Sequence, residues 1–242
     1  MAAETVKGTV VALGGGGFSM SDDGSSLIDD HLLELTGRSR PRVCFVPTAS
    51  GDDDDYSGRF VAAFTGRAET SVLSLFCHEP WGYSDPRVLL EQDLVYVGGG
   101  STANLLAVWR LHGLPAILRE AAAQGTVLAG ISAGMNCWFE GSSTDSFGPL
   151  APLPDGLGLV AGSACPHYLG EPGRRELYRR WVGAGALADG WAADDYTAVV
   201  TRDGAFVEAV AEQPDRPVVR VVREGETGVE HEVGVRLLRG RG

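Results

Sequence analysis

Short apolar runs that end in glycine or turn residues recur along the first half of the chain. They read GTVVAL (Gly8–Leu13), RVCFVP (Arg42–Pro47), SVLSLF (Ser71–Phe76), LVYV (Leu94–Val97) and TVLA (Thr126–Ala129). Because these runs are continuous instead of alternating with polar residues, they are typical of strands buried on both faces, as in a parallel sheet.

Helical patterns lie between and after these runs, at Asp52–Phe64, Ala103–His112, Ala116–Gln124 and Arg174–Val182. Two of them stop at a glycine, Gly113 and Gly125, which is a signal for a helix C-terminus. Alternating strands and helices predict a three-layer, mostly parallel, doubly wound α/β sheet. Such sheets bind their ligands at the carboxyl ends of the strands.

The end of the chain has a different pattern, with successive apolar segments and Gly or Pro turns between them. We expect strands at Tyr196–Thr201, Ala205–Ala211, Val218–Arg223 and His231–Leu238. The length of 242 residues fits one α/β domain. We therefore predict a single domain over residues 1–242, with a β-rich C-terminal extension over about residues 205–242.

Composition narrows the classes of partner. A net charge of −12 argues against nucleic acid, because phosphate binding needs a basic field. No apolar run approaches the ~18 residues of a membrane span. The segment Met1–Thr9 lacks the pattern of a signal peptide, so we expect a cytoplasmic protein. The four cysteines lie far apart, which favours reduced thiols and no metal site.

The sequence Gly130-Ile131-Ser132-Ala133-Gly134 follows a predicted strand and precedes a stretch, Met135–Phe139, that can be helical. This is the context of a nucleophile elbow, in which a sharp turn exposes the serine hydroxyl above the sheet. A β-carbon at Gly130 or Gly134 would collide with the neighbouring strand or helix. The alternative is a tight glycine-rich turn with an incidental serine.

The run Gly98-Gly99-Gly100-Ser101-Thr102 also lies between a predicted strand and a predicted helix. Its backbone N–H groups, with the N–H of Ala133, predict an oxyanion hole built by Gly99, Gly100 and Ala133. The alternative is a phosphate-binding loop, although the Gly-Lys-Ser/Thr ending of such loops is absent. A second glycine run, Gly14–Gly17, indicates only that backbone segments pack closely there.

A serine nucleophile needs a base, and His167 is the best candidate among five histidines. It lies after an apolar stretch and before a Gly-Glu-Pro-Gly loop, as expected of a catalytic group at the end of a strand. Structural or surface roles suit the others better: His31, His78, His112 and His231.

In combination, these motifs resemble the peptidase E (aspartyl dipeptidase) family, to which the cyanophycinases are related. The motifs are GGGST at 98–102, GISAGM at 130–135, PHY at 166–168 and the later Asp194-Asp195, and they cover most of the chain. The resemblance implies a fold like the class I glutamine amidotransferases, which is flavodoxin-like, with serine in place of their cysteine. It also implies Ser132 as nucleophile, His167 as base, the glycine loop as oxyanion hole, and dipeptides with N-terminal aspartate as substrates.

The third triad member is less well defined by the sequence. An ordinary α/β-hydrolase has its acid between the serine and the histidine, where this chain leaves few residues for the intervening strands. The family resembled here has a glutamate after the histidine instead, and Asp194 matches that place, with Asp195 as the alternative. A further departure is Cys165, where members of the family usually carry Asn or Asp.

Two arginines follow His167 across the Gly/Pro loop, and the family has a substrate-binding arginine in this stretch. We expect Arg175, or alternatively Arg174, to bind the aspartyl carboxylate through its planar fork. The prediction is thus a cofactor-free and metal-free serine dipeptidase that binds small peptides, as a monomer or a homodimer. The alternatives are a cyanophycinase-like enzyme or an esterase with the same triad, or a non-catalytic binding module.

Overall fold

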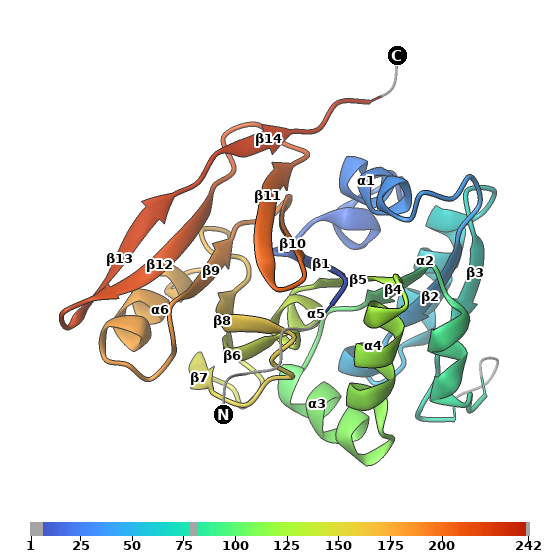
Figure 1. The fold of residues 1–242 in the computed structure, drawn as a ribbon, viewed down its shortest axis with the longest axis horizontal. Coiled ribbons are helices and arrows are strands. Elements are labelled where there is room, and N and C mark those ends of the chain that lie inside the picture. The colour runs from blue at the N-terminus through green and yellow to red at the C-terminus, as the bar shows by residue number, and fades with distance from the viewer. Residues whose placement is uncertain (1–6, 78–81, 241–242) are drawn as a thin grey trace.

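The computed structural model describes residues 7–77 and 82–240, and its strands form two sheets (Figure 1). Within these residues the first sheet has eight strands in the order β14-β11-β10-β1-β5-β4-β2-β3. Their bounds are β1 Thr9–Leu13, β2 Arg42–Val46, β3 Glu69–Val72, β4 Leu94–Val97, β5 Val127–Ile131, β10 Thr197–Arg202, β11 Ala205–Ala211 and β14 Val235–Leu237. The strands from β1 to β3 in this order are all parallel, as the continuous apolar runs predict.

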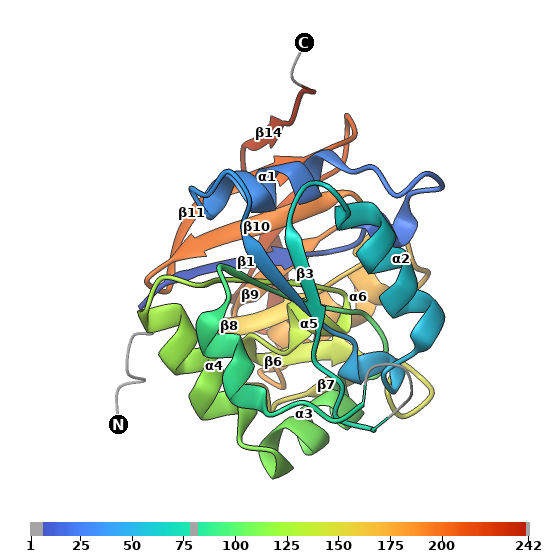
Figure 2. The same ribbon diagram turned by 90° about the vertical axis from the view of Figure 1, so that its right-hand side faces the viewer.

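Helices cover both faces of the parallel part of this sheet. Alternate residues of each strand contact different partners: Val10 and Val95 belong to the core under α3 and α4, whereas Val11 and Leu94 belong to the core under α1 and α2. The helices are α1 Leu27–Leu35, α2 Asp54–Phe64, α3 Thr102–Leu111 and α4 Leu114–Ala123. Figure 2 shows α1 at the top and α3 and α4 at the bottom, with β1 between them.

The second sheet has, among the described residues, six strands in the order β13-β12-β9-β8-β6-β7. They are β6 Phe139–Thr144, β7 Ala151–Leu153, β8 Val160–Cys165, β9 Gly190–Ala193, β12 Val218–Glu224 and β13 Thr227–Glu232. One face continues the core under α3 and α4, and the other packs against α6, Arg174–Gly183. Strands β6, β8 and β9 are parallel to each other, so their carboxyl ends lie at one edge.

The strands of the C-terminal segment are divided between the two sheets. β10 extends the first sheet antiparallel to β1, and β11 pairs antiparallel to β10. β12 pairs with β9 of the second sheet, and β13 pairs with β12. The predicted strand at His231–Leu238 is in fact two, because β13 ends at Glu232 and β14 crosses to pair with β11. The predicted helix at Met135–Phe139 is likewise corrected: α5, Ala133–Asn136, is one turn long, and Phe139 begins β6.

No helix within the described residues has the length and apolar character needed to cross a lipid bilayer. The four cysteines are free thiols; Cys44, Cys137 and Cys165 are buried and Cys77 is exposed.

Asp29, on α1, is a buried carboxyl group beneath the N-terminal glycine run. Its Oδ2 accepts the backbone N–H of Phe18 at 2.7 Å. Burial raises the pKa of Asp29 to about 7, and the charge of Glu212 acts in the same direction. A carboxyl group with a raised pKa favours the folded state at low pH. Its contribution is fully present below pH 3.8 and is lost as the pH rises through about 7.

The variant Asp29→Asn should therefore change how stability depends on pH. The amide oxygen can still accept the Phe18 N–H, but it never ionises. We expect the variant to be more stable than the wild type by about 1–3 kcal/mol at pH 8 and no more stable at pH 4. Urea unfolding at both pH values measures this. Asp55→Asn, at an exposed position of α2, is the control, and an equal pH dependence in both variants would contradict the assignment.

Candidate active site

Ser132 lies at the turn between β5 and α5 in a strained backbone conformation. Its φ is 56° and its ψ is −108°, a region that residues other than glycine rarely adopt. The flanking glycines permit this turn: a Cβ at Gly130 would overlap the carbonyl oxygen of Gly134, and one at Gly134 would overlap that of Val97. Ser132 thus lies in a sharp turn from a strand to a helix, and the residue is half-buried.

The glycine loop after β4 lies beside this serine. A Cβ at Gly99 would come within 3.4 Å of the Ser132 Cβ. Ala133 is the first residue of α5. The backbone N–H groups at the start of a helix have no acceptor within the helix, so the N–H of Ala133 is free of an intrahelical hydrogen bond. The N–H of Gly99 donates to the Tyr56 hydroxyl at 3.3 Å, so this donor is engaged in the structure.

His167 follows β8 and faces Asp195, which follows β9. Their Nδ1 and Oδ1 atoms are 2.6 Å apart, and both side chains are largely buried. His167 also has a positive φ, 51°. The hydrogen bond holds the imidazole so that its Nε2 remains for another partner.

Of the two acids considered from sequence, Asp194 and its alternative Asp195, it is Asp195 that contacts His167. Asp195 stands at the corner of a turn in which the N–H of Thr197 donates to the Asp194 carbonyl. This turn directs the Asp195 side chain to His167. The Asp194 carboxylate instead accepts the backbone N–H groups of Leu169 and Gly170.

The end of β1 and the start of the Gly14–Gly17 run bring these segments together. Three consecutive carbonyl oxygens accept one N–H from each of them: Leu13 from Ser132, Gly14 from His167, and Gly15 from Tyr196. A Cβ at Gly15 would overlap Asp195 Oδ1 and lie 3.1 Å from His167 Nδ1. From sequence, the glycine run indicates only that backbone segments pack closely there. The structure gives the reason: Gly15 packs directly against the His167–Asp195 pair.

The two arginines after His167 have different environments. Arg175, the residue favoured by the sequence, forms a two-point ion pair with Glu230 and has a 53% exposed side chain. Arg174 is 3% exposed, and its Nε donates to Glu171 at 2.6 Å. Its Nη1 is buried and has no hydrogen-bond partner within the described part of the chain.

Two further features bear on the chemistry of the site. Burial raises the pKa of the Cys165 thiol to about 12, so this cysteine stays protonated and is a poor nucleophile. Nowhere in residues 7–77 and 82–240 do three or more His, Cys, Asp or Glu side chains gather as metal ligands would.

The other histidines lie in different surroundings. His112 caps the C-terminus of α3, His231 pairs with Glu224 at the surface, and His31 is buried on α1 near Glu208. His78 lies outside the described residues.

The fold is a mixed α/β fold that resembles those of solved peptidases. A crystal structure of a peptidase from an acI-B1 Actinobacterium superposes with a TM-score of 0.65 at 15% identity, covering 96% of each chain. The coarse fold class predicted from sequence, mixed α/β, is therefore confirmed.

Within this class, the sequence model of peptidase family S51 matches residues 10–209, and the chain belongs to this family. The uncharacterised peptidase YgaJ of Bacillus subtilis (strain 168) is 44% identical over 225 residues, which are 93% of this chain and 94% of that protein. Peptidase E of Streptomyces coelicolor is 33% identical over 146 residues, 58% of each chain. The resemblance to the peptidase E family is thus confirmed, and the protein is a peptidase.

The contact between Gly15 and Asp195 gives a test of the site geometry. Gly15→Ala places a methyl group where Asp195 Oδ1 lies, so the carboxylate has to leave His167. We expect Ser132 to react with a fluorophosphonate about 10- to 100-fold more slowly in this variant, with the fold retained. The control is Gly58→Ala on α2, where a Cβ has no atom within 4 Å. Wild-type reactivity in Gly15→Ala would contradict the described geometry.

Proposed function

We propose that this chain is a serine peptidase that hydrolyses short peptides through an acyl-enzyme at Ser132, with dipeptides bearing N-terminal aspartate as its preferred substrates. The observation that carries the proposal is the 2.6 Å contact between His167 and Asp195 beside the strained Ser132 turn. Membership of a peptidase family supports the reaction class. We further propose the three-layer scaffold expected from sequence, which is supported by the helices on both faces of the parallel strands.

In the proposed mechanism, Ser132 Oγ attacks the scissile carbonyl carbon while His167 Nε2 takes its proton. Asp195 accepts the Nδ1–H and stabilises the imidazolium that forms. The same proton then passes to the leaving amine, the C–N bond breaks, and an ester to Ser132 remains. A water molecule, deprotonated by His167, hydrolyses this ester and restores the serine.

The tetrahedral intermediate carries a negative oxygen that needs donors already in place. We assign this role to the N–H of Ala133, the residue after Ser132, and to the glycine loop at Gly99 and Gly100. A Cβ at Gly99 would lie 3.4 Å from the Ser132 Cβ, which supports the assignment. Tyr56 must yield the Gly99 N–H to the oxyanion, or lie beside it as a further donor. Donors fixed in this way stabilise developing charge without the cost of reorganising solvent.

For the aspartyl carboxylate, the environments of the two arginines favour Arg174 over Arg175. Arg175 is committed to Glu230, whose pKa is lowered by the hydrogen bonds that this guanidinium donates. Arg174 has a buried Nη1 that finds no acceptor among the described residues. A buried N–H donor without an acceptor is unfavourable. A substrate carboxylate that accepts a hydrogen bond from Arg174 Nη1 removes this cost, so such a substrate is preferred over one without a carboxylate.

Two other reaction classes remain alternatives because the same triad serves them: hydrolysis of esters, and a cyanophycinase-like cleavage of β-linked Asp-Arg. A non-catalytic binding module is the alternative outside enzymes. A panel of aryl esters, Asp-X dipeptides and β-linked Asp-Arg separates the enzymatic classes. Fluorophosphonate labelling at Ser132 separates all of them from a binding module, in which the serine would not react.

Removing the nucleophile tests the proposal directly. Ser132→Ala should lower kcat for an Asp-X dipeptide by about 1,000-fold or more, with the melting temperature unchanged or raised. We expect only a small rise at most in the melting temperature, because alanine at position 132 has to adopt the same positive φ and the turn stays strained. Peptidase activity equal to the wild type in this variant would refute the proposal.

The proposed role of Asp195 as the triad acid has its own test. Asp195→Asn should lower kcat by about 100- to 10,000-fold, because the amide no longer holds the imidazole in the required tautomer. The control is Ala193→Gly at the end of β9, which perturbs the backbone of the same segment and leaves the carboxylate in place. A larger loss from that control than from Asp195→Asn would show that the segment acts only through folding.

The specificity assignment compares adjacent arginines. Arg174→Lys keeps the charge but loses the planar fork, and it should lower kcat/KM for Asp-X about ten- to several-hundred-fold. A neutral aryl ester should be affected far less, because it has no carboxylate to lose. Arg175→Lys is the matched control, with both substrates within about twofold of the wild type. A selective loss in Arg175→Lys would instead support the arginine favoured by the sequence.

A further inference from the structure

Asp194 is a buried carboxylate next to the candidate triad that takes no part in the proposed reaction. It is 1% exposed. Its Oδ1 accepts the backbone N–H groups of Leu169 and Gly170 at 2.9 and 2.8 Å, and its Oδ2 accepts Arg216 Nη1 at 3.1 Å. A carboxylate removed from water in this way is stable only with such partners.

The two N–H groups belong to the turn that carries His167. Four consecutive residues of this turn donate their N–H groups to the ends of β1 and β9: His167 to Gly14, Tyr168 to Ala193, and Leu169 and Gly170 to the Asp194 side chain. The positive φ of His167 is unfavourable by itself, so the surrounding contacts have to maintain it. The Asp194 carboxylate supplies two of these four contacts.

The same turn also packs against the triad acid. A Cβ at Gly170 would overlap Asp195 Oδ2, so the backbone of this residue lies directly on the carboxylate that binds His167. Asp194 holds Gly170 in this position. A displacement of the turn would therefore change the distance between His167 and Asp195.

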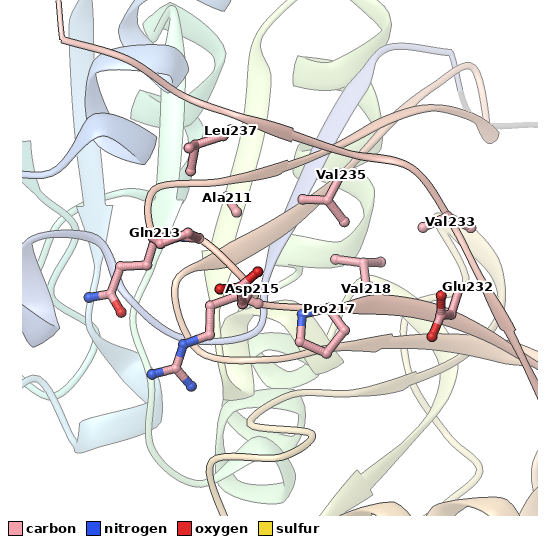
Figure 3. A pocket seen from close by; sticks show the side chains of 11 residues that line it. Ala211, Gln213, Asp215, Pro217, Val218, Glu232, Val233, Val235 and Leu237 are labelled. Carbon is pink, nitrogen blue, oxygen red and sulfur yellow. The ribbon is translucent and has the colours of Figure 1, made fainter.

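Arg216 brings the only cation that is paired with Asp194 among the described residues. It lies between β11 and β12, where the Pro217 carbonyl also accepts the Asp194 N–H at 3.2 Å. Its guanidinium lies over the ring of Tyr196, the residue after Asp195, at 5.5 Å. The same segment, Arg216 included, lines a cavity of about 450 Å³, whose other lining residues include Val233 and Val235 (Figure 3).

We propose that Arg216 and Asp194 form a positioning pair, which holds the turn bearing His167 against Asp195 and so aligns the imidazole with Ser132. This inference rests on the proposed function of Ser132, His167 and Asp195. Neither member of the pair touches the substrate. Their effect is on the rate of the chemical step and on the His167–Asp195 hydrogen bond, and substrate binding is left nearly unchanged.

The test uses Arg216→Met, Arg216→Lys and the double variant D194N/R216M in the full chain. Arg216→Met should lower kcat for an Asp-X dipeptide about 10- to 100-fold with KM within about threefold, because the imidazole is misaligned. It should also weaken or abolish the far-downfield proton resonance of His167 Nδ1–H. Arg216→Lys should retain most of the wild-type kcat and most of the intensity of this resonance.

The double variant D194N/R216M shows whether Arg216 acts through the Asp194 carboxylate or only through its own charge. An asparagine in place of Asp194 no longer needs a cation, yet its amide oxygen still accepts the two N–H groups. D194N/R216M should therefore be more active than R216M alone, a non-additivity expected of residues in one network. Arg236→Met, which breaks an exposed pair with Glu208, is the control and should leave kcat and the resonance unchanged.

The proposal is overturned if Arg216→Met retains the wild-type kcat and resonance, or if the double variant is no more active than Arg216→Met. Should Arg216→Met fail to fold, the folded double variant decides: a retained resonance supports the pair, and a lost one contradicts it. The resonance does not depend on turnover. If wild-type Ser132 fails to react with a fluorophosphonate, the proposed function fails while the positioning pair remains testable.

Discussion

The site depends on the backbone at the end of β1. The carbonyl oxygens of Leu13, Gly14 and Gly15 each accept an N–H from a different segment of the candidate triad. Two of these segments come from the second sheet and one from the first, so the three contacts join the carboxyl ends of both sheets. Side chains cannot enter this junction, because a Cβ at Gly14 would overlap the carbonyl oxygens of Ala193 and Asp194. The glycine run is therefore a requirement of the site and not an incidental loop.

Around this junction, unfavourable backbone conformations are concentrated. Ser132, His167 and Tyr196 all have positive φ, although none is glycine. Such conformations cost on the order of 1–3 kcal/mol each, and they persist only where the surrounding structure determines them. The parallel strands on either side are largely buried and provide that support. The strain fits the function proposed here, since a serine hydroxyl and an imidazole that face a common site each require a sharp turn at the end of a strand.

Much of this arrangement could be predicted from sequence because it is local. The apolar runs indicate the parallel strands, and Gly130 and Gly134 around Ser132 indicate the turn. What the sequence left open depends on contacts between distant segments. The pairing of β12 with β9, the crossing of β14 to β11 and the short α5 follow from which sheet each segment joins, which periodicity does not encode. The single-domain organisation, the cytoplasmic location and the oligomeric state stay predictions.

The choice between neighbouring residues illustrates this limit most sharply. Asp194 and Asp195 are chemically identical, yet one binds backbone N–H groups and the other binds His167. Arg174 and Arg175 likewise differ in burial and partner, because consecutive residues of a helix point about 100° apart. In each pair a turn or a helix sets which side chain faces the site, and a shift of one residue would exchange their roles. Residue type therefore cannot distinguish a carboxylate that accepts backbone N–H groups, such as Asp194, from one that orients a histidine, such as Asp195. They are distinguished by the backbone geometry that the distant segments impose.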